Sequence, residues 1–193
     1  MAETVHDIRD ALADAALRCI ARWGLTKTAL EDVAREAGSS RATLYRAFPG
    51  GGKDALFSAL ADRELARLEA AARATVDRAS DLEDAVVGAI GSIARHLEDH
   101  AAFQFLLAHE PGLVLPHLAF HHLDALLGRV RDVGGPMFER FLAPADAAAL
   151  AESVARIVIS HTCCPSVGVR LTDDSSVRRL VRAFVLPGLL IPI

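Results

Sequence analysis

Apolar residues recur at intervals of three or four positions along most of this chain, which is the spacing of one face of an α-helix. Proline and glycine interrupt this pattern, most densely at residues 111–116 and 134–136. The pattern predicts helices over about 4–23, 30–37, 41–48, 54–77, 82–100, 102–109, 114–131, 144–163 and 175–186. In the first of them the apolar face carries Ile8, Leu12, Ala15, Ala16, Cys19, Ile20 and Trp23, and Gly24 ends the helix.

The segment 28–48 is typical of two short helices joined by a glycine turn. Thr28 and Glu31 have the spacing of a capping box, which predicts that a helix starts between them. Gly38 adopts the left-handed backbone conformation at little cost and is expected to end that helix. Ser40 is a good N-cap for a second helix.

The second helix of this hairpin carries hydrogen-bond donors on the side that it is expected to expose. These are Arg41, Thr43, Tyr45 and Arg46, while Leu44 and Phe48 are left to pack inward. Arginine reads guanine edges, hydroxyl groups reach phosphates, and a small residue such as Ala42 lets the helix start approach the groove. The pattern favours DNA binding. An ordinary helical hairpin with a solvated polar face is the alternative.

The run from Ala15 to Leu60 resembles the N-terminal domain of the TetR family of bacterial transcription regulators. The similarity lies in A-A-L-R-C-I-A-R-W-G-L, in the hairpin, in L-Y-R-A-F and in K-D-A-L-F. It implies an all-α fold of about nine helices, about three of them for DNA. It also implies a helix-turn-helix DNA-binding domain over 1–53 and a helical effector-binding and dimerisation domain over 54–193.

The same resemblance assigns roles to individual residues. Contacts to phosphates or sugars would fall to Thr28, Ser40, Arg41, Thr43, Tyr45 and Lys53, and contacts to bases to Arg41, Ala42 and Arg46. The chain departs from the common family pattern in one place. The linker P-G-G-G between Phe48 and Lys53 is longer than usual and rich in glycine, so Lys53 is expected at a different height above the DNA backbone.

The net charge of the whole chain is −4, but the charge is unevenly distributed. Residues 1–53 carry eight basic and seven acidic side chains, whereas residues 22–53 carry six basic and three acidic ones. The region of the hairpin therefore attracts phosphate, while the acidic remainder repels it. This distribution favours DNA as a partner of the hairpin region, and the resemblance implies that the partner is a double-stranded operator.

The last two predicted helices carry apolar stripes. The first stripe is Leu150, Val154, Ile157 and Val158 with His161, and the second is Val177, Leu180, Val181, Phe184 and Val185. In TetR-like proteins the corresponding helices pair across a twofold axis, so the resemblance implies a homodimer. Packing within one chain is the alternative for each of these residues.

The middle of the chain is rich in aliphatic and aromatic residues with scattered histidines, which suits a largely apolar ligand. The candidate ligand-binding residues are Phe103, Leu107, Phe120, His121, Leu127 and His161. The segments S-H-T-C-C-P-S and R-A-F-V-L-P-G-L are similar to actinobacterial TetR-type regulators, some of which respond to lipid metabolites. An ordinary hydrophobic core is the alternative interpretation.

Pairs of histidines suggest a second kind of sensor. His96 with His100, and His117 with His121 and His122, have the spacing that places imidazoles on one helix face. Cys163 and Cys164 beside His161 are candidates for a redox switch. No further ligand recurs with motif spacing, so neither a metal nor a cofactor is predicted. No catalytic motif is present, which argues against an enzyme.

The apolar stretches are too short and too interrupted by proline to span a bilayer, and the N-terminus lacks a signal-peptide pattern. The sequence therefore predicts a cytoplasmic protein with reduced cysteines. In function, the resemblance implies a ligand-responsive transcriptional repressor that binds a palindromic operator as a homodimer and is released by a small, largely apolar effector. Metal or redox sensing, and DNA binding without small-molecule control, are the alternatives.

Overall fold

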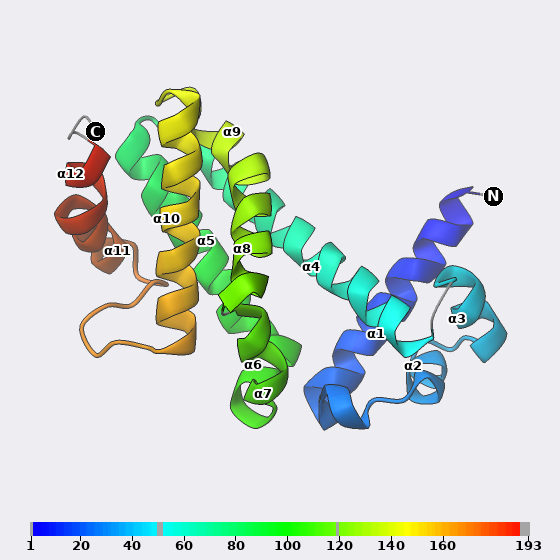
Figure 1. Cartoon of the computed structure of the whole chain (residues 1–193). Coiled ribbons are helices and arrows are strands. Elements are labelled where there is room, and N and C mark those ends of the chain that lie inside the picture. The colour runs from blue at the N-terminus through cyan, green and yellow to red at the C-terminus, as the bar shows by residue number, and fades with distance from the viewer. Residues whose placement is uncertain (1, 50–51, 119, 190–193) are drawn as a thin grey trace. The chain divides into compact units, whose positions relative to one another are not determined.

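The protein is described by a computed structural model that covers residues 2–49, 52–118 and 120–189. Side chains are described for these residues except 2–6, 117, 120–122 and 189. All regular secondary structure in these ranges is helical (Figure 1), which confirms the predicted all-α fold class.

The chain divides into two compact units. The first comprises Met1–Ala66 and His100–Val114. Its helices are α1 (Ala2–Lys27), α2 (Leu30–Glu36), α3 (Arg41–Ala47), the first part of α4 (Lys53–Val76), α6 (Ala101–His109) and α7 (Pro111–Val114). Apolar side chains from α1 to α4 and from α6 form one core, in which Leu12, Leu44 and Leu56 are fully buried.

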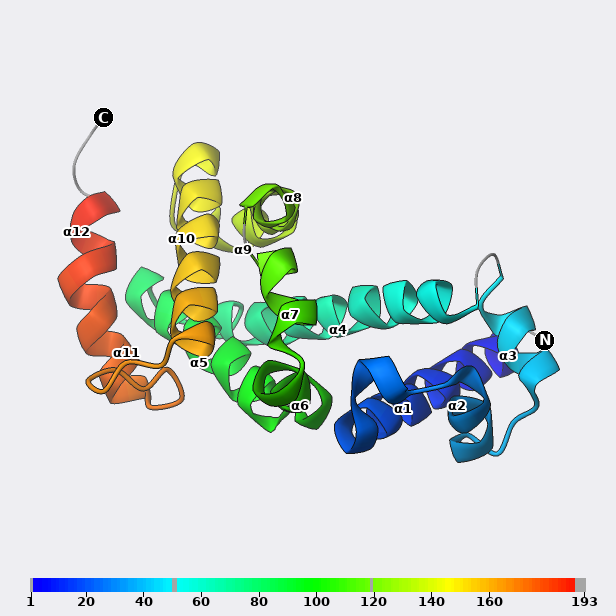
Figure 2. The ribbon, with the colours of Figure 1, turned by 60° about the horizontal axis from the view of Figure 1, so that its bottom comes forward.

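The second unit comprises Arg67–Asp99 and Leu115–Ile193. Besides the end of α4 it contains α5 (Leu82–Asp99), η1 (Leu115–Leu118), α8 (Phe120–Arg129), η2 (Val130–Gly134), α9 (Gly135–Phe138), α10 (Pro144–Cys163), α11 (Asp174–Leu180), η3 (Val181–Val185) and α12 (Leu186–Leu189). Both α10 and α11 pack against α5 (Figure 2), and the core between them includes Val86, Ile90 and Leu150.

These units do not follow the boundary that the sequence predicts at residue 53. Helix α4 runs through both units, and α6 belongs to the first one. The reason is packing, because Ala102 is buried in the core of the first unit and Leu106 packs against it. The division of roles at residue 53 stays a prediction.

Helix α1 changes direction at the glycine that the sequence predicts as its end. Gly24 has φ 82° and ψ 168°, outside the helical region. The predicted apolar face is buried from Leu12 to Ile20, but Trp23 is 42% exposed, so its place on that face is wrong. Trp23 stands next to the break, where the helix no longer faces the core.

Prolines are accommodated in a way that the sequence pattern did not predict. The predicted helix 114–131 is interrupted by the 3₁₀ turn η1, which contains Pro116. The π-helical turns η2 and η3 directly precede the short helices that contain Pro136 and Pro187. A π turn widens the helix before the proline ring, which would otherwise clash with a preceding carbonyl. The helices therefore continue to Phe138 and Leu189, past their predicted ends.

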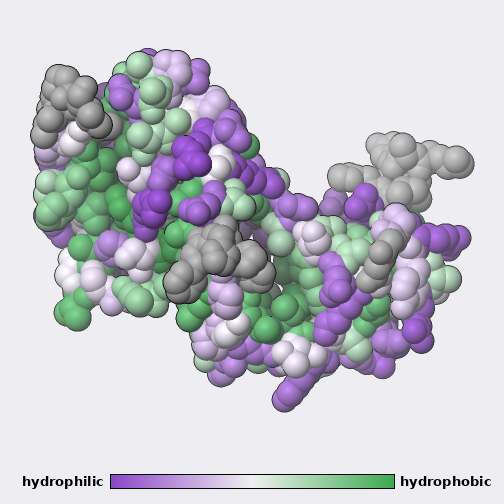
Figure 3. Space-filling model, in the orientation of Figure 1, coloured by the Kyte–Doolittle hydropathy of each residue, from purple (hydrophilic) through white to green (hydrophobic). Residues whose placement is uncertain are grey.

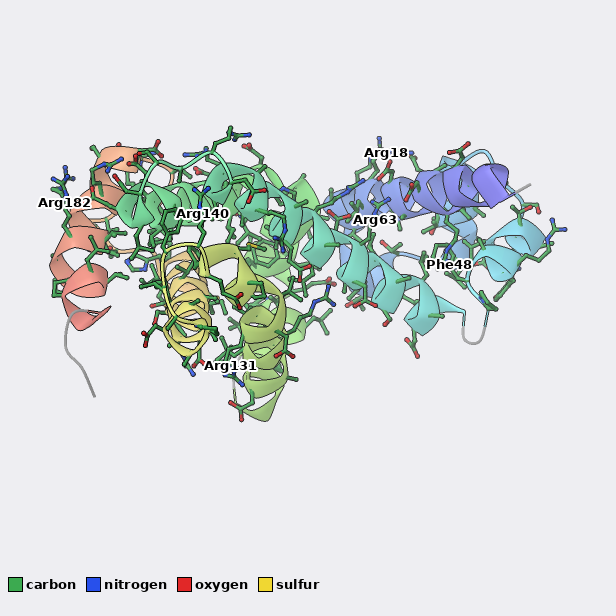
Figure 4. The ribbon with its side chains drawn as sticks, turned by 90° about the horizontal axis from the view of Figure 1, so that it is seen from above. Arg18, Phe48, Arg63, Arg131, Arg140 and Arg182 are labelled. Carbon is green, nitrogen blue, oxygen red and sulfur yellow. The ribbon has the colours of Figure 1, made fainter. Side chains whose placement is uncertain are left out.

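Arginine side chains fasten helices within each unit (Figure 4). In the first unit, Arg63 of α4 donates to the Asp14 carboxylate at 2.6 Å and to the Asp10 carbonyl at 3.2 Å, both on α1. In the second unit, Arg140 donates to the carbonyls of Val76, Asp77 and Ala79 at the end of α4. The bonds from Arg140 add donors to carbonyls at the C-terminal end of α4, where the helix itself supplies no further amides.

Candidate nucleic-acid interface

The helix-turn-helix hairpin forms where the sequence predicts it. Helix α2 ends at Glu36, and Gly38 follows with a φ of 61°, a backbone conformation that favours glycine. The Gly38 amide donates to the Arg35 carbonyl at 3.1 Å, and the Ser39 amide donates to the Ala34 carbonyl at 2.8 Å. These bonds close the end of α2 and turn the chain toward α3.

The start of α3 has the predicted cap. Ser40 is the N-cap, and its hydroxyl oxygen accepts a hydrogen bond from the Thr43 amide at 3.1 Å. The Thr43 hydroxyl lies 2.9 Å from the Ser40 hydroxyl and accepts from Arg46 at 3.3 Å. The polar side chains along this face of α3 are therefore arranged by one another before any DNA binds.

The two sides of α3 differ as predicted. Leu44 and Phe48 are buried in the core of the first unit. Arg41, Ala42, Tyr45 and Arg46 are exposed, and Thr43 is half-buried. The Tyr45 side chain is notable because 45% of this large residue is exposed. An exposed helix face of donors around a small residue is suited to a major groove.

Arg41 has a partner in the free protein. Its guanidinium lies 2.8 Å from the Glu31 carboxylate on α2, and both side chains are at least half exposed. A surface ion pair of this kind contributes about 0 to 1 kcal/mol, so DNA can displace it at little cost. Glu31 thereby holds Arg41 at the start of α3.

The capping box predicted at Thr28 is wrong. The N-cap of α2 is Ala29, and no side chain caps it. Thr28 is only 1% exposed, and its hydroxyl donates to the Gly24 carbonyl at 2.6 Å. The reason is the turn after Gly24, whose carbonyl lies close enough to accept from both the amide, at 3.2 Å, and the hydroxyl of Thr28. Thr28 has no exposed hydroxyl for a phosphate, so we leave it out of the proposed DNA-contacting surface.

Lys53 also has partners within the protein. Its ammonium group donates to the carbonyls of Leu25 at 2.9 Å and Thr26 at 3.2 Å, at the end of α1. An ammonium group has three protons, so one remains for a phosphate. A contact from Lys53 to DNA stays a prediction.

Two arginines outside the hairpin fasten it to α1. Arg18 and Arg22 of α1 lie 2.7 Å and 3.2 Å from the carboxylate of Glu36, the last residue of α2. The hydrogen bond from Arg18, supported by the charge of Arg22, holds the pKa of Glu36 below its ordinary value. Figure 4 shows Arg18 on α1. The sequence gives no spacing signal for this bridge, because the partners are distant along the chain.

Removal of the Ser40 hydroxyl is expected to destabilise the first unit by about 1 kcal/mol, the usual cost of replacing a serine N-cap by alanine. Urea unfolding followed through the fluorescence of the only tryptophan, Trp23, measures the change for Ser40→Ala. Ser39→Ala removes the neighbouring hydroxyl and serves as the control. Equal unfolding midpoints for the two variants would contradict the capping role.

Comparison with known proteins agrees with this geometry. Residues 12–60 match the family described as bacterial regulatory proteins, tetR family. This segment contains the hairpin, most of α1 and the start of α4. The match identifies residues 12–60 as a domain of the TetR type.

Solved structures extend the similarity of the fold to nearly the whole length of the chain. AlkX, a TetR family repressor from Dietzia sp. strain DQ12-45-1b, has a TM-score of 0.68 at 23% identity over 94% of each chain. FadR from Bacillus halodurans has a TM-score of 0.59 at 18% identity, covering 92% of this chain and 96% of its own. A TetR-like regulator from Rhodococcus sp. RHA1 has a TM-score of 0.56 at 18% identity, covering 94% and 95%. At these identities, what is shared is the fold. No curated protein gives a significant match in sequence.

The predicted ligand-binding residues fall in both units. Phe103 and Leu107 are half-buried on α6 in the first unit. Leu127 on α8 is 1% exposed and His161 on α10 is half-buried, both in the second unit. Phe120 and His121 lie outside the described side chains. A shared effector site therefore stays a prediction.

The histidines and cysteines that the sequence suggests as sensors can be compared with their contacts in the structure. His100 caps α6 by accepting from the Phe103 amide at 3.1 Å, and its other ring nitrogen lies 3.4 Å from Glu64. The side chains of His117, His121 and His122 are outside the described part of the structure. Burial raises the pKa of Cys163, which makes its thiol less reactive. Within the described residues no group of three histidine, cysteine or acidic side chains is arranged to hold a metal ion.

None of the described helices combines the length and the apolar character needed to cross a membrane.

Proposed function

We propose that this protein is a ligand-responsive transcriptional repressor of the TetR family. It binds a palindromic operator as a homodimer and is released by a small, largely apolar effector. The observation that carries the proposal is the surface of α3, where Arg41, Ala42, Tyr45 and Arg46 are exposed around a helix start capped by Ser40. This arrangement supports base reading by Arg41 and Arg46 and phosphate contacts by the hydroxyl groups.

The dimer is supported by two arguments. A single recognition helix reads only a few base pairs, so a specific operator needs two of them about 34 to 36 Å apart. In addition, the C-terminal helices of the protomer leave apolar surface uncovered. Phe184 is 82% exposed, and Figure 3 shows hydrophobic surface over the region of α10 to α12. A second copy of the same helices would bury it.

The alternative of packing within one chain holds for most residues of the C-terminal stripes. Val177, Leu180, Val181 and Val185 are buried in the core of the second unit, as are Leu150, Val154 and Val158. Ile157 and His161 are half-buried. The proposed dimer surface is therefore centred on Phe184 and not on the whole of both stripes.

An apolar effector is supported by the composition of residues 103–127, which are mainly aliphatic and aromatic. Two proteins of similar fold point in the same direction. AlkX is implicated in biodegradation of n-alkanes, and FadR is a regulator of fatty acid degradation. Alkanes and fatty acids share long apolar chains. An effector has to favour the DNA-incompetent state by a few kcal/mol to release the operator.

Selection of duplexes from a random DNA pool by the purified protein tests the proposal. Enrichment of a palindrome whose half-sites are about one helical turn apart supports it, and no enrichment overturns it. Native mass spectrometry of the same preparation measures the dimer mass and any co-purified molecule. If long-chain fatty acids, acyl thioesters and alkanes all leave a selected duplex bound in a gel shift, the apolar effector class is wrong.

A further inference from the structure

The last residues of α1, just after its break at Gly24, are held by two charged side chains that lie far away in sequence. The Glu110 carboxylate accepts hydrogen bonds from the Leu25 amide at 2.6 Å and the Thr26 amide at 3.3 Å. The carbonyls of the same two residues accept hydrogen bonds from the Lys53 ammonium group, Leu25 at 2.9 Å and Thr26 at 3.2 Å. Charge-assisted hydrogen bonds thus hold the amide and the carbonyl of both Leu25 and Thr26.

Gly24 allows the carboxylate to approach. A Cβ atom at this position would lie 2.8 Å from the Cδ and Oε2 atoms of Glu110. The φ of 82° is in addition one that other residues rarely adopt. The Gly24 carbonyl accepts from the Thr28 hydroxyl at 2.6 Å, which secures the following residues. The turn and the carboxylate are therefore fitted to each other.

The position of Glu110 depends on α6. Glu110 is the C-cap of that helix, and its amide donates to the Leu106 carbonyl at 2.8 Å. Helix α6 packs on α1 (Figures 1 and 2), with Ala102 buried in the core of the same compact unit. Any displacement of the end of α6 would therefore lengthen or break the hydrogen bonds from the Leu25 and Thr26 amides to the Glu110 carboxylate.

The charge on Glu110 is favoured in the folded protein. Partial burial by itself raises the pKa of Glu110, but hydrogen bonds from Thr26 and Leu25 and the nearby charge of Lys53 outweigh it. The net effect is a pKa below the ordinary value, so the stabilisation is present at neutral pH and is lost as pH falls through the folded-state pKa.

We propose that Glu110 is a positioning residue that sets the path of the chain from α1 into the helix-turn-helix, and that operator selectivity depends on it. The inference rests on the proposed function and names the contact through which α6 acts on the DNA-reading helices. An effector that moves the end of α6 would break the Glu110 bonds and release the turn.

Amide hydrogen exchange tests the anchor without DNA. In Glu110→Gln we expect exchange at Leu25 and Thr26 to become about tenfold faster, because a charged hydrogen bond is replaced by one neutral acceptor and a clashing donor. Glu139→Gln removes the same charge from an exposed residue of the second unit and serves as the control. Lys53→Met, which removes the bonds from the other side, is expected to accelerate the same two amides. Unchanged exchange in Glu110→Gln would overturn the anchor.

A selectivity measurement separates positioning from plain structural support. The readout is the ratio of affinities for a duplex selected by the wild-type protein and a scrambled duplex. We expect Glu110→Gln to lower this ratio about tenfold, with Glu139→Gln leaving it unchanged. Faster exchange with an unchanged ratio would overturn the positioning role. If the wild-type protein selects no duplex, the proposed function fails and the positioning role fails with it, while exchange still decides the anchor.

Discussion

Replacement of Arg41 by alanine is expected to lower operator affinity by about 1 to 3 kcal/mol for each half-site and to relax specificity at the base it reads. Arg41 is the first residue of α3, with its side chain 60% exposed and paired with Glu31 at the surface. Since a dimer presents the residue twice, the loss for the whole operator is about 2 to 6 kcal/mol. The effect is the largest that we expect from a single change at the DNA-contacting surface.

The measurement is a titration of selected and single-base-substituted duplexes at constant salt, because affinity for DNA falls steeply with ionic strength. Arg35→Ala is the matched control. Arg35 is an exposed arginine in the last turn of α2, and it is paired with Asp32. The Arg35→Ala variant therefore removes the same charge from a residue that does not belong to α3. If the two variants weaken all duplexes equally, Arg41 acts through its charge alone and base reading by this residue is wrong.

Replacement of Phe184 by arginine is expected to separate the proposed dimer. Burying a phenylalanine side chain contributes about 1.5 to 3 kcal/mol, and a twofold interface contains the residue twice. Arginine would add two like charges near the axis. We therefore expect the dissociation constant of the dimer to rise at least about 100-fold, with loss of operator binding.

Sedimentation velocity over a range of protein concentrations measures this change directly. Leu115→Arg is the control, because Leu115 is also an exposed apolar residue of the second unit but lies outside the C-terminal helices. A dimer that persists in Phe184→Arg would show that the subunits associate through a different surface. Separation by both variants would show a general loss of stability.

Local rules predicted the structure of the helix-turn-helix hairpin well, since its features depend on residues close together in sequence. Gly38 adopts the left-handed conformation, Ser40 caps α3, and Leu44 lies inward while Tyr45 lies outward. Each follows from backbone preference or from helical spacing. The same rules failed at Thr28, because the break at Gly24 offered its hydroxyl a nearer acceptor than the start of α2.

The C-terminal helices illustrate a different limit. Helical spacing put Val181, Phe184 and Val185 on one apolar stripe, yet the first and last are buried and Phe184 is exposed. The π turn over Val181–Val185 changes the angle between successive side chains, so spacing calculated for an α-helix no longer assigns them to one face.

The sequence by itself determined the all-helical class, the position of the helix-turn-helix and the side of α3 that carries the donors. Periodicity, capping and glycine conformation act over a few residues and need no knowledge of the rest of the chain. Only the tertiary structure decided that α6 belongs to the same compact unit as the DNA-contacting helices and that Glu110 binds the turn after Gly24. Both features depend on contacts between residues that are distant along the chain, such as Leu25 and Glu110. Local spacing cannot predict such contacts, because the burial that selects them exists only once the core has formed.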